Sequence, residues 1–278
     1  MSASLINADP TPIHTVGRLI ANFIIAIGDL TWFMCLTVGG LLGQLPRSRV
    51  LWPVMYEVGV RSVPVIAVTG LFIGMVLAVQ SYDTLRMYRL ESRIGSVINV
   101  SLVRELGPVL AATMLAGRVG CAMAAEIGTM RVTEQIDALK ALGADPISYL
   151  VVPRLLACFC LIPALTLVAD GVGILGGWVV SVKLLGVNDH LFWLYSQQFI
   201  TAYDVISGVM KSMFFGAAIS IIACHRGFHC GSGAEGVGKA ATDSFVCSFI
   251  AILALDLVLA ILLNSVSRLL WAIGIPVV

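Results

Sequence analysis

The chain has 278 residues, of which 59% are hydrophobic and only 12% are charged, and its net charge is +1. Soluble domains carry roughly 25% charged residues, so the sequence has about half of the charge that a water-facing surface needs. This composition, with a mean hydropathy of +0.97, excludes an ordinary soluble domain and predicts an all-α integral membrane protein, because a bilayer can solvate the apolar outer faces of helices. The near-neutral charge argues against nucleic acid as a partner.

The first 50 residues form a separate N-terminal segment in our interpretation, and residues 51–278 form one transmembrane domain. Between residues 15 and 45, polar Arg18, Asn22 and Asp29 lie away from most of the apolar side chains. The apolar set recurs at helical spacing and comprises Val16, Leu19, Ile20, Phe23, Ile27, Leu30 and Met34. This pattern favours an amphipathic helix in the membrane interface over a spanning helix, which stays the alternative.

Five later stretches are long and apolar enough to cross a membrane, which takes about 20 residues. They are residues 63–82, 94–125, 155–182, 205–224 and 245–266. Within them, Gly70 with Gly74 and Gly173 with Gly177 have the spacing that permits close helix packing.

The distribution of lysine and arginine sets the expected orientation. With the N-terminus inside, the cytoplasmic segments hold nine such residues: Arg18, Arg47, Arg49, Arg61, Arg131, Lys140, Arg154, Arg226 and Lys239. The outer segments hold four: Arg86, Arg89, Arg93 and Lys183. The sequence therefore predicts a cytoplasmic N-terminus.

Charged residues inside the expected spans are the main candidates for a functional site. Arg104 and Glu105 lie on the second span, Lys211 on the fourth and Asp256 on the fifth. Each ionised group at mid-membrane costs about 2.5–3.5 kcal/mol on the insertion scale, so such residues need partners. Their charges sum to zero, which fits either a structural ion network or a network that lines a transport path. Asp170 is a further costly carboxylate on the third span.

Two motifs suggest ligand sites but lack essential parts. Gly233 to Lys239 has the spacing of a phosphate-binding P-loop, but Ala240 follows where that motif needs Ser or Thr, and a span precedes it where a strand is required. Cys224, His225, His229 and Cys230 place four potential zinc ligands within seven residues. Adjacent pairs converge poorly on one ion, so we predict no metal site there, no bound cofactor and no enzyme active site.

Residues 133–143 form a short polar segment between the second and third spans. Thr133 is a reasonable N-cap, and Gly143 a reasonable end, for a helix that carries Ile136 and Leu139 at helical spacing. Charged Glu134, Asp137 and Lys140 lie alongside these apolar residues. Such a helix either lies on the lipid surface or docks into another protein.

The same region carries a family resemblance that covers roughly residues 50–265. The sequence resembles the MlaE/YrbE family of permeases in Arg104-Glu-Leu-Gly-Pro108, Ala116-Gly-Arg-Val-Gly120, the run from Ala125 to Leu139, Asp145-Pro-Ile, Leu150-Val-Val-Pro-Arg154, Ala169-Asp170 and the run from Gly233 to Thr242. It departs from the family pattern at Ala240-Ala241-Thr242, which has one threonine where the family often has two, and at Ala260, where threonine is expected.

The resemblance implies a homodimeric permease of a bacterial inner membrane that works with two cytoplasmic ABC ATPase subunits, which would bind ATP and magnesium. It implies a phospholipid or related lipid as substrate and an MCE-domain lipid-binding protein on the outer side. The segment 133–143 would be the coupling helix that contacts the ATPase, through Glu134, Gln135, Ile136, Asp137 and Leu139. Arg104, Glu105, Lys211 and Asp256 would lie near the lipid cavity.

Two other functions fit the residues without an ATPase. A secondary transporter could use Glu105, Asp170 and Asp256 as a proton relay, and a scaffold could anchor an envelope complex without transporting anything. Co-purification of an ATPase, and stimulation of its ATP hydrolysis by lipid, would separate these alternatives from an ABC permease.

Overall fold

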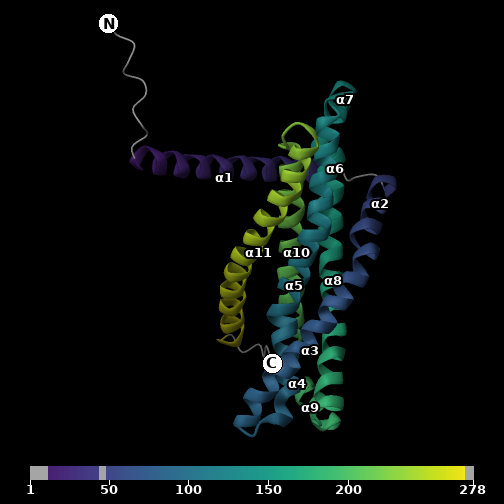
Figure 1. Cartoon of the computed structure of the whole chain (residues 1–278), viewed down its shortest axis with the longest axis vertical. Helices are drawn as coiled ribbons and strands as arrows, with labels where there is room; N and C mark the ends of the chain where they lie inside the picture. The colour runs from purple at the N-terminus through teal and green to yellow at the C-terminus, as the bar shows by residue number, and fades with distance from the viewer. Residues whose placement is uncertain (1–11, 44–47, 273–278) are drawn as a thin grey trace.

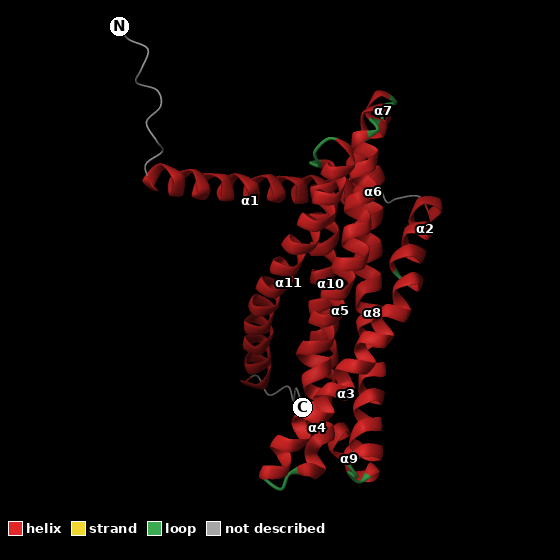
Figure 2. Cartoon of the chain, in the orientation of Figure 1, coloured by secondary structure: helices red, strands yellow, loops and turns green. Residues whose placement is uncertain are grey.

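The structure, a computed structural model, describes residues 12–43 and 48–272. Within these ranges the chain is helical, with short turns and no strand (Figure 2). Six helical segments are long and apolar enough to cross a membrane, which confirms the predicted class of all-α integral membrane protein.

The helices follow one another with short connections. Their bounds are α1 Pro12–Gly43, α2 Ser48–Val58, α3 Val63–Met87, α4 Ile94–Ser101, α5 Gly107–Leu115, α6 Cys121–Val132, α7 Gln135–Ala141, α8 Val152–Trp178, α9 Asp189–Phe199, α10 Ala202–Phe228 and α11 Gly233–Ala272. Four π-helical turns, Leu102–Leu106, Ala116–Gly120, Ile147–Val151 and Val179–Leu184, continue or join these helices. The five predicted spans correspond to α3, the run from α4 to α6, α8, α10 and α11.

Helices α3 and α8 form the closest pair in the bundle because glycines face each other along their contact. A Cβ atom built on Gly70 would lie 2.5 Å from the carbonyl oxygen of Ala169, and one on Gly74 would overlap the carbonyl of Gly173. Gly177 in turn lies near Gly74. The two predicted glycine pairs therefore meet each other, and the missing side chains let the two backbones touch.

Helix α1 runs across the long axis of the bundle, at the end where α6 leads into α7 (Figure 1). Its Ile24–Leu41 stretch is apolar enough to span a membrane, but only a small part of it is buried against the rest of the chain. Phe33 and Thr37 are the buried side chains that seat it on α10 and the turn Ile147–Val151. Its position in the membrane interface stays a prediction, because the same stretch also has the length and hydropathy of a span.

Helix α9 and its neighbours close the opposite end of the bundle (Figure 1). The sequence analysis assigned no helix to these residues. Asn188 caps α9 by accepting a hydrogen bond from the Leu191 backbone N–H, and Phe192 is fully buried against α4. The amide of Asn99 donates to the hydroxyl of Ser196 over 2.7 Å, which fixes α9 across the end of α4.

Candidate functional site

Lys211 is the centre of a cluster of charges from three helices. Its side chain is only 2% exposed, and its Nζ atom lies 2.5 Å from Glu105 Oε2 and 3.0 Å from Asp256 Oδ1. Asp256 Oδ1 accepts no hydrogen bond, so its contact with Lys211 is an ion pair alone. The structure thus brings together three of the four predicted site residues, on α10, on the π-turn before α5, and on α11.

The π-turn Leu102–Leu106 presents Glu105 to Lys211. Its wider coil, with hydrogen bonds between residues five apart, is rare overall but frequent at functional sites. The ammonium of Lys211 also donates to the backbone carbonyl of Arg104 over 3.4 Å. One lysine therefore holds both a side chain and the backbone of this turn.

Arg104 does not join the Lys211 cluster through its side chain, contrary to the single network that we considered. Its guanidinium lies 3.9 Å from Asp204 Oδ1 and donates a hydrogen bond to the side-chain oxygen of Asn264. Asp204 lies in the first turn of α10 and forms a capping box with Thr201. The spacing of Thr201 and Asp204 is typical of a capping box and could have indicated the start of this helix. The sequence analysis missed Asp204 because the predicted fourth span began at residue 205.

The charges are partly open at the surface of the single chain. The Glu105 side chain is 41% exposed, and Arg104 and Asp256 are partly exposed as well. In residue count, Lys211 lies nine positions from the start of α10, roughly 14 Å along the helix, so the cluster lies well within a span. Charges at such a depth need a covering of protein, water or lipid headgroup instead of acyl chains.

A second group of charges borders a groove beside α2. The groove holds about 500 Å³, and its lining includes Glu57, Arg118, Glu126 and Arg154. Arg118, on the π-turn Ala116–Gly120, donates to the Ser62 hydroxyl. Arg154 is buried and pairs with Glu126 over 2.7 Å. The sequence analysis assigned no role to this group, because its members come from four separate helical segments.

Asp170 lies in the core next to Gly107, where a Cβ atom would overlap its carboxylate. Its Oδ1 atom has no hydrogen-bond partner, and no hydrogen bond among the described residues joins it to Glu105 or Asp256. The continuous path that the proton-relay alternative requires is therefore not formed by side chains in this part of the chain.

Helix α7 is shorter than predicted and faces its own chain. It spans Gln135–Ala141, with Glu134 as N-cap in the left-handed region at φ 60° in place of Thr133. Ile136 is 0% exposed and packs with residues of α1, α6, α8 and α10, and Leu139 is partly buried against the same cluster. These two residues pack α7 on the bundle of its own chain, and their contact with an ATPase stays a prediction.

The outer surface of α7 is charged, with one exposed apolar residue at its end. Arg131 donates to both carboxylate oxygens of Asp137 at 3.0 Å each, and Lys140 lies 3.4 Å from Asp137. Glu134 and Gln135 are exposed. Leu142, which follows the helix, is 84% exposed and was not among the predicted contact residues.

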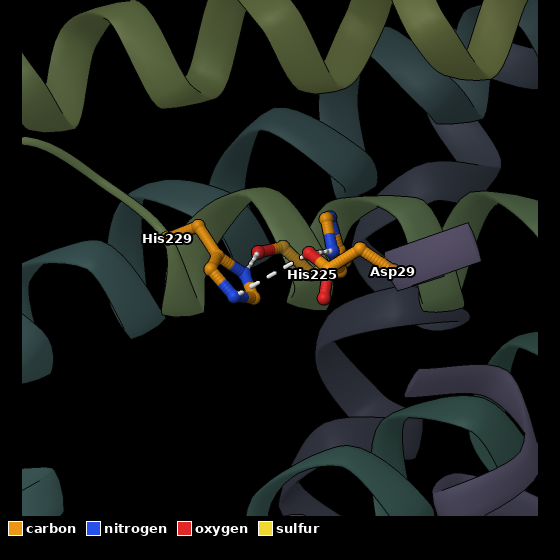
Figure 3. A group of neighbouring side chains, drawn as sticks. All are labelled: Asp29, His225 and His229. Carbon is orange, nitrogen blue, oxygen red and sulfur yellow. Dashed lines mark hydrogen bonds and ion pairs between the residues drawn. The ribbon is translucent and has the colours of Figure 1, made fainter. Parts of the chain in front are cut away.

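The four potential zinc ligands among residues 224–230 do not converge in the structure. Cys224 is buried in the core, and the thiol of Cys230 donates to the carbonyl of Gly128. His225 and His229 instead face Asp29 of α1 (Figure 3).

A bundle of helices long and apolar enough to cross a membrane, with ion pairs inside the spans and a short charged helix at one end, defines a multi-pass membrane protein. The family described as Permease MlaE matches residues 51–262, and the chain belongs to that family.

Three relatives illustrate the similarity. "Intermembrane phospholipid transport system permease protein MlaE" of Haemophilus influenzae is 36% identical over 252 residues, which cover 89% of this chain and 95% of the relative. A "Probable ABC transporter permease protein" of Rickettsia prowazekii is 42% identical over 241 residues, or 86% of this chain and 93% of the relative. A protein of the same description from Synechocystis is 45% identical over 212 residues, or 76% and 80%.

Proposed function

We propose that this chain is the permease subunit of an ATP-driven ABC transporter that moves phospholipids or related lipids across the bacterial envelope. Two copies form the lipid path in the inner membrane, and two cytoplasmic ATPase subunits bind ATP and magnesium. An MCE-domain lipid-binding protein exchanges lipid on the outer side. The names of the Haemophilus and Rickettsia relatives support the transporter class and the phospholipid substrate.

The single observation that carries this proposal is the open edge of the Lys211 cluster. A carboxylate at mid-span that is 41% exposed in the single chain is unstable against acyl chains, so something polar must cover it. A second copy of the chain and the headgroup of a lipid both meet this need. The apolar helix surfaces around the cluster suit the acyl chains of the same lipid.

The orientation in this proposal follows from the charged end of the bundle. The end formed by α7 and α1 carries Arg131, Lys140 and the buried Arg154 with its partner Glu126, and it is the end that the distribution of lysine and arginine assigns to the cytoplasm. Helix α7 is then the coupling helix. Its exposed Glu134 and Gln135, together with Leu142, form the surface offered to the ATPase.

The test is purification of the tagged chain from its own host in mild detergent, followed by reconstitution in phospholipid vesicles. We expect an ABC ATPase to co-purify, ATP hydrolysis to rise on addition of phospholipid, and lipid transfer to continue when an ionophore collapses the proton gradient. Recovery of the chain without an ATPase, with lipid transfer abolished by the ionophore, would establish the proton-coupled alternative instead.

A further inference from the structure

Asp29, His225 and His229 form a compact group of possible metal ligands where α1 crosses the end of α10 (Figure 3). The three ligand atoms lie within 4.8 Å of one another. The two histidines are four residues apart on α10 and so point from one face of that helix. Asp29 reaches them from a helix almost 200 residues earlier in the chain.

The distances within the group match those of ligands around one small divalent ion. Asp29 Oδ2 lies 2.9 Å from His225 Nε2 and 3.7 Å from His229 Nε2. Zinc binds imidazole nitrogen and carboxylate oxygen at about 2.0–2.1 Å, which places neighbouring ligand atoms of a tetrahedral site roughly 3.3 Å apart. The two observed distances lie on either side of this value.

The hydrogen bonding of His229 prepares it to bind a metal. Its Nδ1 lies 2.9 Å from the backbone carbonyl oxygen of His225, and because a carbonyl only accepts, Nδ1–H must donate. In the neutral ring, the lone pair of Nε2 then faces the carboxylate of Asp29. A metal ion between these two atoms would accept both lone pairs and relieve their repulsion. A backbone carbonyl behind a ligating histidine is the usual partner in zinc sites.

We propose that Asp29, His225 and His229 form a site for zinc or a similar transition-metal ion, which fastens the interfacial helix α1 to the transport bundle. Two imidazoles and one carboxylate suit zinc better than magnesium or calcium, which prefer oxygen ligands. His225 is buried, whereas His229 and Asp29 are half exposed, so the fourth position of the ion faces solvent. Phe33, one turn after Asp29 on α1, packs edge-on against the His225 ring and supports the same contact.

The sequence alone indicated two of the three ligands of this site. The two histidines belong to the motif that also contains Cys224 and Cys230, and the four side chains of that motif do not converge. Asp29 supplies the third ligand only because α1 folds back across α10, and no spacing in the sequence indicates that contact.

The experiment measures zinc binding to the full chain by titration calorimetry. The chain is purified through an affinity tag that contains no histidine, so that the tag binds no zinc. We expect one zinc ion per chain. Mutation of a residue that only hydrogen-bonds to a metal ligand typically weakens metal affinity about 10–100-fold. Loss of a ligand itself, in Asp29→Asn or His229→Gln, should therefore weaken zinc affinity at least about tenfold. His190→Gln is the matched control, because His190 is an exposed histidine on α9 at the other end of the bundle.

A second measurement on the unaltered chain tests the fastening of α1. Hydrogen exchange of the backbone around Asp29 and Phe33 should slow when zinc is added and stay unchanged with magnesium. The proposal is overturned if the chain binds no zinc in stoichiometric amount, if Asp29→Asn and His229→Gln bind zinc as the unaltered chain does, or if zinc leaves the exchange of α1 unchanged.

Discussion

At the residue scale, Lys211 places a full charge between two carboxylates on other helices, in a position that is only 2% exposed. Removing one partner of a buried ion pair typically costs about 3–5 kcal/mol. What remains is the mutual repulsion of Glu105 and Asp256, which no other lysine or arginine side chain in the described chain neutralises by an ion pair.

Lys211→Met should therefore lower the thermal unfolding temperature and abolish most lipid transport at normal expression. Replacing Glu105 by Gln in the same chain should restore part of both, since it removes one of the two repelling charges. Lys183→Met serves as control because Lys183 is exposed near α9. Full transport by the single variant in vesicles would exclude the cluster from the transport mechanism.

Asp145 gives a prediction about pH, because it lies between α7 and α8 and outside the spans. Partial burial would raise the pKa of its carboxyl, but hydrogen bonds from the Ser148 hydroxyl and from the backbone N–H groups of Ser148 and Ile147 outweigh it and lower the pKa. A lowered pKa in the folded state contributes stability that is present above the unfolded value of about 3.9 and is lost as the pH falls through the folded value.

Asp145→Asn should accordingly be less stable than the unaltered chain at pH 7, and the difference should shrink as the pH falls below about 4. Thermal unfolding in detergent between pH 3 and pH 7 measures this. Ser148→Ala should show a smaller loss of the same sign, because the backbone donors remain. A difference that is constant over this range would assign the effect of Asp145 to something other than its charge.

At the scale of helices, the contact between α3 and α8 depends on absent side chains. Gly74→Ala would place a methyl group on the backbone of Gly173, which no rotamer change can relieve. Overpacking of this kind typically costs about 1–3 kcal/mol. The variant should unfold at a clearly lower temperature and yield less folded protein. Gly171→Ala on α8 is the matched control, because nothing lies within 4 Å of the added atom, and it should unfold like the unaltered chain.

Helix α7 separates two kinds of apolar residue that look alike in sequence. Leu142→Asp should release the ATPase while leaving the permease folded, because Leu142 is 84% exposed. Ile136→Asp should destabilise the permease itself, since a carboxylate would enter a fully buried position. Co-purification of the ATPase, with thermal unfolding of each permease variant, distinguishes the two outcomes. If Leu142→Asp keeps normal ATPase binding and normal lipid-stimulated hydrolysis, the ATPase contacts another surface.

The spans were predictable because the length of an apolar stretch can be read directly from the sequence. Each of the five predicted segments lies within a continuous helical segment, which includes π-turns in two cases. The pairing of Lys211 with Glu105 and Asp256 was accessible as well, since charges in a bilayer must find one another. The separate pairing of Arg104 with Asp204 was not, because it depends on which way each residue of a π-turn points. The burial of the Ile136 side chain against its own chain was not predictable either, because it depends on how α7 folds back onto the bundle.

At the scale of the whole molecule, the two ends of the bundle differ in chemistry. Helices α1 and α7 lie at one end and α9 at the other (Figure 1). In a cysteine-free background, a single cysteine at Leu142 should react with a membrane-impermeant maleimide only from the cytoplasmic side. A cysteine at Leu184, which is exposed near α9, should react only from the outer side. Labelling of spheroplasts and inverted vesicles checks this, and the reverse pattern would invert the proposed orientation.

The π-turns of the run from α4 to α6 have a consequence for the phase of that long helix. Each π-turn accommodates a residue that an α-helical turn would not, and one residue corresponds to about 100° of rotation and about 1.5 Å of rise. Deleting a single residue within Leu102–Leu106 would leave an unbroken helix of nearly the same length. The two halves of that helix would nevertheless be turned against each other by more than a quarter of a revolution. The helix faces before and after Glu105 could then no longer both pack against their present neighbours. In this segment the one extra residue therefore sets the direction in which side chains point, with little effect on the length of the helix.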